Sequence, residues 1–576
     1  MKSLTKVKEI IEKRNIVCSY YLEEQREMPG RAGDLLIAKK KQHHKGLPVL
    51  GLSRLSLLLL LLLGSNCRAA KILVLFPHAS ESHFAVMRTL VAELAGREHN
   101  VTVYGGHGLG ERLERVAETV VAPEYDFWSN LQQHAAAGGS LEDLARLSDS
   151  RLRSSLAQVG AQALDHFLAQ PSLQALLQLP SAEFDYDVII VDYFYTEALL
   201  ALGYKHNKPT IGIVSTDFGN YMNTVQEALV PVACSPIDFE AYTSELGFAA
   251  RLANIRECIS RRKQFHKEHY AAQEKLIRKH FKIAANVPQL QAQHLALLLL
   301  NTHVPLWTPR PLVQQIVPAG GLHIRGPREL PWHIKRYAEE SRDGIIYMQL
   351  GNEQLCGQLP KEKLRILFEF IGGRKERFIW TCHDVTTLES LPKNSMIQHG
   401  VPQIDILAHP RVRAFIMNGD LLSLQEGIMR HVPMLGLPSF QNERKNMQLA
   451  VSLGVGLQLE QSNFTKAALD WALDELTTQQ DYQLAIREVS SEFRDRPLGA
   501  LANAMFWVNY VVRHKGGAAI RTRGIDIGSN QLHLFDLFVF YFALAIVICA
   551  VLVAVYFGVV YALQRKRNDA KLSKLS

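Results

Sequence analysis

The feature that most constrains this chain is an unbroken apolar run near its C-terminus, Leu537 to Leu563. A helix rises 1.5 Å per residue, so the run reaches roughly 40 Å, enough to cross a bilayer with some tilt. Arg565, Lys566 and Arg567 follow directly, and basic clusters stay on the cytoplasmic side of a membrane. We therefore expect one transmembrane helix preceded by a lumenal or extracellular chain. A buried core helix is the alternative, which the unbroken length and basic end disfavour.

A second apolar block, Leu57 to Leu63, lies near the N-terminus and has the layout of a secretory signal peptide. It follows Arg54 and precedes the small residues Ala69 and Ala70, so cleavage near Ala70 is expected. Residues 1–53 precede this block, whereas an ordinary signal peptide has a short basic leader. An over-long start or an uncleaved signal anchor would each explain the extension. Together the two apolar runs predict a type I membrane protein.

Charge and cysteine content argue against two classes of function. The formal net charge is +8 at pH 7, but part of it lies in the leader and the C-terminal tail. No basic stripe with interleaved aromatic residues occurs between them, so no nucleic-acid partner is expected. Of the seven cysteines, four lie between the expected cleavage point and the C-terminal apolar run: Cys234, Cys258, Cys356 and Cys382. None has the spacing of zinc ligands, so no metal is expected, and spacing does not reveal how they pair in an oxidising lumen.

The first half of the globular region alternates buried strands with helices. Lys71–Phe76 is a continuous strand run, apolar residues at helical spacing extend from Met87 to Leu94, and Val101–Tyr104 is the next expected strand. Two later strands are expected at Asp187–Asp192 and Thr210–Val214. Strands that are apolar on both faces and joined by helices form a parallel sheet covered on both sides. The first half therefore predicts one doubly wound α/β domain.

The second half repeats this pattern after a stretch rich in proline and glycine, Pro305 to Pro331, which has the composition of a linker. Four further strands are expected: Gly344–Met348, Arg377–Trp380, Ala414–Met417 and Pro433–Leu437. The predicted fold class is α/β, with two doubly wound Rossmann-like domains facing a cleft where ligands bind. Fold alone leaves a periplasmic-style binder, a reductase or a glycosyltransferase open. No Gly-x-Gly-x-x-Gly follows the first strand to favour a dinucleotide.

The most specific motif extends from Val401 to Asn446. Its fixed positions include Pro402, Gln403, Phe415, Gly419, Ser423, Glu426, Pro433, Pro438, Phe440 and Asn446. In order and spacing this region resembles the donor-binding region of the UDP-glucuronosyltransferase family, membrane enzymes with the two-domain arrangement called GT-B. The resemblance extends to Ser82-His83-Phe84 after the first strand, to Gly320–His323 in the linker, and to the anchor with its basic end. It covers nearly all of residues 71 to 570.

The resemblance implies transfer of a sugar from a UDP-sugar, held by the second domain, to a small lipophilic acceptor in the first, with no bound cofactor. It implies that a histidine after the first strand acts as general base, oriented by an aspartate; His83 and Asp192 stand at those positions. A carboxylate beside an imidazole fixes its tautomer and supports the imidazolium that forms. The plainer alternative is a surface loop histidine and a strand-end aspartate, and His78 is a weaker candidate base.

The expected organisation follows from these assignments. The segments are an N-terminal extension (1–53), a signal peptide or signal anchor (54–70), an acceptor-binding domain (71–304), a linker (305–342), a UDP-sugar-binding domain (343–510), a return and juxtamembrane segment (511–536), the transmembrane helix (537–563) and a cytosolic basic tail (564–576).

On the donor side the sequence departs from the family pattern. Met417-Asn418-Gly419-Asp420 stands where the family has Thr-His-Gly-Gly at a strand-to-helix turn. Asp420 places a carboxylate at a helix N-terminus, where it is expected to cap the free N–H groups and repel phosphate. Gly400 and Val401 stand in place of the tryptophan that stacks on uracil. Loss of that platform costs about 1–3 kcal/mol.

The sugar-binding positions depart as well. Asn442-Glu443 replaces the Asp-Gln pair expected to hold sugar hydroxyls, and Asn352 replaces a serine. We expect Glu443 to add a second negative charge to the cleft. Asn418 and Gly419 remain candidates for donor contact, and Arg444 or Lys445 is a candidate to supply the missing phosphate contact. Retained family residues are Gln403 for the base edge, Ser423 for phosphate and Glu426 for the ribose hydroxyls.

Two main hypotheses follow from this mixture. An active UDP-glycosyltransferase is supported by the retained His83, Asp192, Gln403 and Glu426. A catalytically weak or inactive relative, which binds lipophiles or pairs with active members, is supported by the altered donor residues. A third, an unrelated lumenal binding or transport protein, does not explain the ordered motif.

The resemblance also implies a location and partners. It implies the endoplasmic reticulum membrane, with the globular part lumenal, and a role in detoxification. The plasma membrane is the alternative because Lys571 and Lys574 fit a dilysine signal poorly. Assembly into homo-oligomers or hetero-oligomers with family members is implied by resemblance alone. Glycosylation sequons begin at Asn100 and Asn463, and Asn463 is the better candidate because Asn100 opens an expected strand.

Overall fold

The structure is a computed structural model that describes residues 69–572 with gaps. The residues outside the description are 1–68, 79–80, 123–124, 126, 136–146, 148, 216–246, 308–311, 352–358, 383–390, 523–530, 532–533 and 573–576. The predicted N-terminal extension, nearly all of the predicted signal segment, and Asn352 therefore lie outside the described residues.

The first domain contains a seven-stranded parallel sheet with the order β3-β2-β1-β4-β5-β6-β7. Its strands are β1 (Lys71–Phe76), β2 (Asn100–Gly105), β3 (Val116–Val120), β4 (Val188–Asp192), β5 (Thr210–Val214), β6 (Leu295–Leu300) and β7 (Ile316–Pro318). The strands expected from the sequence are confirmed at β1, β2, β4 and β5. Strand β6 was not expected, because a run of leucines favours helix as much as strand.

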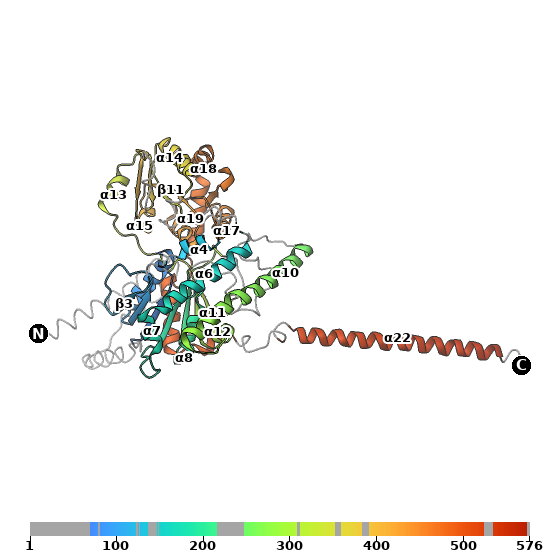
Figure 1. Cartoon of the computed structure of the whole chain (residues 1–576). Helices are drawn as coiled ribbons and strands as arrows, with labels where there is room; N and C mark the ends of the chain where they lie inside the picture. The colour runs from blue at the N-terminus through green and yellow to red at the C-terminus, as the bar shows by residue number, and fades with distance from the viewer. Residues whose placement is uncertain are drawn as a thin grey trace, which may run out of the picture. The chain divides into compact units, whose positions relative to one another are not determined.

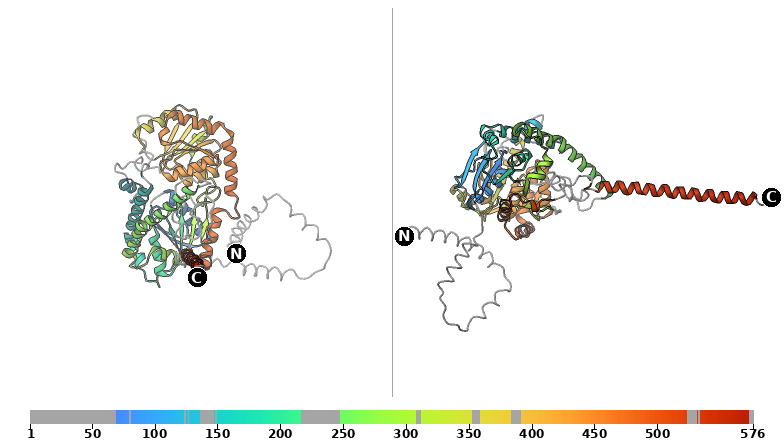
Figure 2. Two further views of the ribbon diagram at one scale, coloured as in Figure 1. Left: turned by 90° about the vertical axis from the view of Figure 1, so that its right-hand side faces the viewer. Right: turned by 90° about the horizontal axis from the view of Figure 1, so that it is seen from below.

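Helices cover both faces of this sheet (Figures 1 and 2). Leu73 and Leu75 of β1 enter one core, whereas Ile72 and Val74 enter the other, as strand alternation requires. The helical segments of this domain are α3 (Glu81–Gly96), α4 (Phe127–Ala135), α6 (Asp149–Ala169), α7 (Pro171–Gln178), η1 (Glu197–Leu199), α8 (Leu200–His206), α10 (Phe248–Phe265), η2 (His266–Tyr270), α11 (Ala271–Leu276), η3 (Ile277–Phe281) and α12 (Val287–His294).

The second domain contains a six-stranded parallel sheet with the order β10-β9-β8-β11-β12-β13. Its strands are β8 (Ile345–Gln349), β9 (Arg377–Thr381), β10 (Ser395–Gln398), β11 (Val412–Met417), β12 (Met434–Gly436) and β13 (Gly456–Gln458). Its helical segments are α13 (Trp332–Glu339), α14 (Lys361–Gly372), α15 (Gln403–Leu407), α16 (Leu421–Met429), α17 (Gln441–Ser452), η5 (Gln461–Asn463), α18 (Lys466–Thr478) and α19 (Gln480–Arg494). Two doubly wound domains are thus confirmed.

The segment predicted as a linker, 305–342, is more structured than its composition indicates. Its first part contains β7, which pairs with β6 of the first sheet. Its last part contains α13, whose Ile334 and Ala338 are buried in the core of the second domain. Proline and glycine mark the turns between these elements, so the connection proper is shorter than the predicted range.

The C-terminal end of the predicted second domain also differs from expectation. Helix α20 (Ala500–Arg513) was assigned to the second domain up to residue 510, but its apolar face packs against the first. Met505 and Val508 lie in one core with Leu90 of α3. His99 accepts a hydrogen bond from the Ala70 backbone and contacts Asn509 of α20 at 3.1 Å. The short η6 turn (Ala518–Ile520) follows in the same core.

Helix α22 (Phe535–Leu572) contains the predicted apolar run. Within its segment Phe535–Asp569, a window of 18 residues has a mean hydropathy of 3.0 and is not buried by any of the described residues. By length and composition it is able to cross a membrane.

Candidate functional site

The predicted site residues gather where the strand order of each sheet reverses. In the first sheet this point lies between β1 and β4, and His83 and Asp192 lie at the ends of these strands or in the element that follows. In the second sheet it lies between β8 and β11, and Asn418, Gly419 and Asp420 follow β11. Ligands of doubly wound folds bind at such points.

Asp420 is the N-cap of α16, as the sequence predicts. Its side chain accepts a hydrogen bond from the backbone nitrogen of Ser423 at 2.9 Å. Burial raises the pKa of its carboxyl above the usual value, against the lowering effect of the Ser423 hydrogen bonds. A helix N-terminus normally offers such N–H groups to phosphate. Here the chain's own carboxylate takes one of them.

Gly419 makes the turn before that cap. Its φ is 101°, and a Cβ there would lie 2.7 Å from the Glu443 carbonyl oxygen. Asn446 fixes the turn by donating a hydrogen bond to the Gly419 carbonyl oxygen at 2.9 Å. Only glycine fits this position without displacing the backbone of α17.

Glu443 differs from the sequence expectation. Its carboxylate turns back onto its own helix end and accepts hydrogen bonds from the backbone nitrogens of Ser439, at 2.8 Å, and Phe440, at 2.9 Å. The Asn418 amide donates to its other oxygen. Burial raises the pKa of Glu443 to about 7, despite these three donors. Glu443 was predicted to place a second negative charge in the ligand cleft, but its carboxyl group instead caps the start of α17. The neighbouring Asn442 is exposed.

The retained donor residues form one hydrogen-bonded cluster. The Gln403 amide donates to Ser423 Oγ at 2.9 Å and to Glu426 Oε2 at 2.8 Å. Ser423 in turn donates to Gln349 at 2.9 Å. His323 Nε2 lies 3.2 Å from Glu426 Oε1, although it is not aligned for a hydrogen bond. Gln349 was missed from the sequence, because its place at the end of β8 carried no recognised motif.

The structure does not support Arg444 as the residue that supplies the missing phosphate contact. Its guanidinium lies 3.4 Å from the Glu460 carboxylate, which directs it toward the β13 side of α17. Gly400, at the former stacking position, is exposed, whereas Val401 is buried in the domain core. A flat aromatic surface for the base is absent at these two positions.

His83 lies in the first turn of α3 and is buried. Burial lowers the pKa of its imidazole to about 3, with a smaller contribution from His78. Burial likewise raises the pKa of Asp192 well above its usual value. Among the described residues no hydrogen bond joins the two, and both His83 Nδ1 and Asp192 Oδ2 are buried without a partner. The expected orientation of His83 by Asp192 is thus not formed in this structure.

An aromatic wall lies beside His83. The ring of Phe194, two residues after Asp192, stands edge-on to His83 at 5.0 Å and to His78 at 5.5 Å. His78 is held by the Phe194 carbonyl and contacts Phe127 at 5.3 Å. Phe440 of the second domain packs against the same apolar cluster as Phe127. The wall was missed because its members come from four separate segments.

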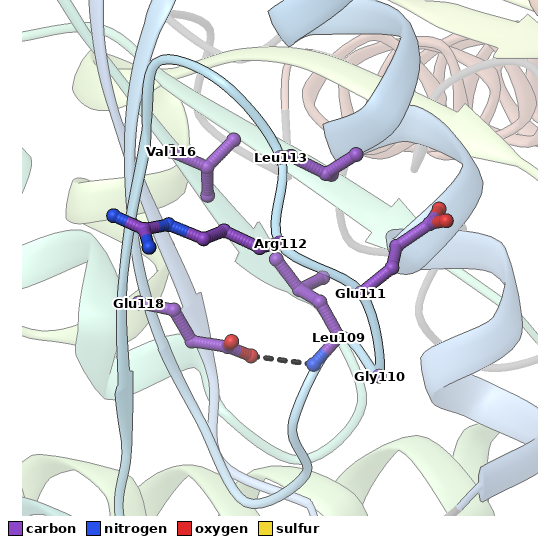
Figure 3. Close-up of a pocket in the computed structure, with 7 residues that line it drawn as sticks. All are labelled: Leu109, Gly110, Glu111, Arg112, Leu113, Val116 and Glu118. Carbon is purple, nitrogen blue, oxygen red and sulfur yellow. Dashed lines mark hydrogen bonds between the residues drawn. The ribbon is translucent and has the colours of Figure 1, made fainter.

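A cavity of about 350 Å³ lies elsewhere in the first domain (Figure 3). It is lined by the loop between β2 and β3, with Arg112 and Glu118 at its edge. The Glu118 carboxylate accepts a hydrogen bond from the Leu109 backbone at 2.5 Å. None of the predicted site residues lines it, so this cavity is distinct from the candidate site.

Two parallel-sheet domains, with candidate site residues at the switch point of each, have the GT-B arrangement of glycosyltransferases. Residues 70–569 match the family described as UDP-glucoronosyl and UDP-glucosyl transferase, and the chain belongs to this family.

Similar proteins agree with this assignment. The chain is 27% identical to UDP-glycosyltransferase UGT5 of Dactylopius coccus over 86% of this chain and 92% of that protein. It is 26% identical to UDP-glucuronosyltransferase 1A7 of Mus musculus, over 87% of this chain and 93% of that protein. The fold is similar to the calicheamicin glycosyltransferase CalG4 (TM-score 0.51, 14% identity, 78% of this chain and 99% of that one). It is also similar to Phytolacca americana UGT2, solved with UDP-2-fluoroglucose and pterostilbene (TM-score 0.50, 16% identity, 77% of this chain and 99% of that one).

Proposed function

We propose that this protein transfers a sugar from a UDP-sugar to the hydroxyl of a small lipophilic acceptor, with no bound cofactor. The observation that carries the proposal is the cluster of Gln403, Ser423 and Glu426 at the switch point of the second sheet. Its amide, hydroxyl and carboxylate are the groups that recognise a base edge, a phosphate and a ribose. Membership of the family supports these roles.

His83 is the proposed general base. Its imidazole is neutral above about pH 3, so a ring nitrogen is free to accept the acceptor's hydroxyl proton as the oxygen bonds to the sugar carbon. The bond from that carbon to the diphosphate breaks, and UDP leaves with the electron pair. Buried polar groups without partners are rare, and this supports the proposal that His83 and Asp192 pair when the acceptor binds. The aromatic wall around Phe194 is the proposed lipophilic surface.

The test is calorimetric titration of the full chain in detergent with UDP and several UDP-sugars, followed by transfer assays on lipophilic alcohols and phenols. Micromolar binding and transfer, lost on Glu426→Ala, are expected. A control at the exposed Gln448→Ala should leave both unchanged. Absence of transfer to every acceptor class despite nucleotide binding would contradict the proposal.

A second candidate function has its own observation. Because Asp420 caps α16 at the place where phosphate would bind, the donor site can be too weak for turnover. The protein would then act as a lipophile-binding or partner protein for active relatives. Nucleotide binding that appears only after Asp420 is replaced would favour this candidate.

We further propose a type I protein of the endoplasmic reticulum membrane, anchored by α22, with a role in detoxification. The exposed apolar span of α22 supports the anchor. The disulfide bond of Cys382 supports an oxidising lumenal environment for the globular part. Both proposed glycosylation sites, Asn463 and Asn100, have exposed side chains, which removes the steric objection to Asn100.

A further inference from the structure

Helix α10 (Phe248–Phe265) carries an apolar stripe that none of the described residues covers. Phe248, Leu252 and Ile259 have exposed fractions of 76%, 49% and 50%. With 100° of rotation per residue, these three and the half-buried Ile255 fall within an arc of about 60°. Apolar residues on one arc of a water-facing helix indicate a surface that is covered by something.

Basic residues line both edges of this stripe. Arg251 and Arg262 lie on one side, and Arg256 and Lys263 on the other, and all four are exposed. The whole helix has five basic residues against a single glutamate, Glu257. A helix with an apolar stripe between rows of arginine and lysine has the composition that lies in a membrane interface, with its cations at anionic headgroups.

The attachment of α10 leaves this face available. Its C-terminal end is fixed to α6, where Gln264 donates a hydrogen bond to Ser154 at 3.0 Å. Its N-terminal end extends away from the other helices of the first domain (Figures 1 and 2). The helix has 18 residues, or roughly 27 Å of length, which is enough to present the stripe to a flat surface.

The chain itself keeps a membrane within reach of this domain. Ile520 is buried in the core that α3 and α20 share, and α22 begins at Phe535. The intervening residues 521–534 span at most about 50 Å when extended. The first domain, which carries α10, is therefore the one tethered close to the bilayer that α22 is proposed to cross.

We propose that the apolar stripe of α10 docks onto the lumenal surface of an anionic phospholipid bilayer as a second membrane contact, in addition to α22. The proposal rests on the proposed membrane anchor. Docking places the acceptor-binding domain, rather than the donor-binding domain, at the lipid surface. A lipophilic acceptor dissolved in the bilayer then reaches that domain without crossing bulk water.

The test uses the full chain in nanodiscs of phosphatidylcholine, with or without phosphatidylserine. A fluorescent amino acid is incorporated at position 252, on the stripe, or at position 253, which is exposed on the other side of the helix. Nitroxide groups on the lipid acyl chains serve as quenchers. We expect quenching at 252 to exceed that at 253 by about threefold, and to fall by at least half without phosphatidylserine.

A charge-reversed variant, Arg256→Glu with Lys263→Glu, should lose the same fraction of quenching. The matched control, Lys361→Glu with Arg365→Glu on α14 of the second domain, should not. Equal quenching at 252 and 253 would overturn the proposal while leaving the anchor intact. A second result would also overturn it: weak quenching at 252 by the lipid nitroxides, together with protection of that fluorophore from aqueous iodide that increases with protein concentration. Such a result would indicate that a second copy of the chain covers the stripe. Failure of the chain to remain with the nanodiscs would overturn the anchor and the docking together.

Discussion

Asp420 Oδ1 lies 2.9 Å from the backbone nitrogen of Ser423, so the chain's own carboxylate occupies one of the N–H groups at the start of α16. The N–H groups at the start of α16 are the natural place for a diphosphate, because they point outward and carry the positive end of the helix dipole. A carboxylate there satisfies the helix internally and adds a negative charge where phosphate would lie. We therefore expect the cap to stabilise the helix and to lower the affinity for a nucleotide.

Replacing Asp420 with glycine should therefore strengthen binding of UDP. We expect an affinity gain of about tenfold or more, measured by calorimetry, because both the repulsion and the competing acceptor are removed. The cost to the helix is a few tenths of a kcal/mol, since glycine is itself a tolerated N-cap.

Asp420→Asn is the matched control for this gain. Asparagine caps as well as aspartate but carries no charge. An increase in affinity shared by both variants assigns the effect to charge, whereas an increase confined to glycine assigns it to competition for the N–H group. No increase with either variant would show that Asp420 does not limit nucleotide binding.

Glu443→Gln should change how stability depends on pH. The fold raises the pKa of Glu443 from 4.5 to about 7, so the folded protein holds this proton more tightly than the unfolded chain does. Its stabilising contribution is full below about pH 4.5 and is lost as the pH rises to about 7. Glutamine resembles the protonated form of Glu443. If the Asn418 amide rotates, its Oδ1, which has no partner among the described residues, is able to accept a hydrogen bond from the glutamine amide.

The free energy of unfolding of Glu443→Gln, relative to the unaltered protein, should thus improve by about 1–3 kcal/mol between pH 5 and pH 8. Denaturation at both pH values measures this difference, in which titration of all other groups cancels. A constant difference between the two proteins would mean that Glu443 stays ionised throughout.

Gln425 connects the two domains from the buried face of α16. Its amide donates to the Asn301 carbonyl oxygen at 2.8 Å, and its oxygen accepts from the Gly321 backbone at 3.0 Å. Gln425→Ala should reduce the free energy of unfolding by about 1–3 kcal/mol, because the buried Asn301 carbonyl oxygen loses the donor described here and the Gly321 N–H keeps only its bond to the Asn301 side chain. The exposed Gln448→Ala should change it by less than about 0.5 kcal/mol. Equal effects in urea denaturation would contradict a role for Gln425 in coupling the domains.

Much of the fold was predictable because buried parallel strands leave a strong local pattern. Strand β5 was expected at its observed limits, Thr210–Val214. Helix α20 was misplaced because its apolar face is compatible with either domain, and only the tertiary contact of Met505 with the α3 core decides. The structured ends of the linker were missed for a similar reason: β7 has three residues, too few for any periodicity.

Those features of the site that depend on residue identity alone could be predicted from the sequence. Capping by Asp420 follows from its place before a helix, and the structure confirms it. The orientation of Glu443 does not follow from its identity, because it depends on the backbone nitrogens of Ser439 and Phe440 that face it. The ring of Phe194 beside His83 depends on a loop conformation that no local pattern specifies.

The last prediction concerns His83 and Asp192, each of which has one buried polar atom without a partner among the described residues. If they act together on the acceptor, His83→Ala should lower kcat/KM by about 10²- to 10⁴-fold, and the double variant with Asp192→Asn should be little worse than His83→Ala alone. Because the pKa of His83 is about 3, kcat/KM of the unaltered protein should show no loss attributable to this residue between pH 5 and pH 8. The exposed His134→Ala serves as the control. Multiplicative effects of the two substitutions on the measured rates would show that His83 and Asp192 act independently, and Asp192 would then be a structural residue of the β4 end.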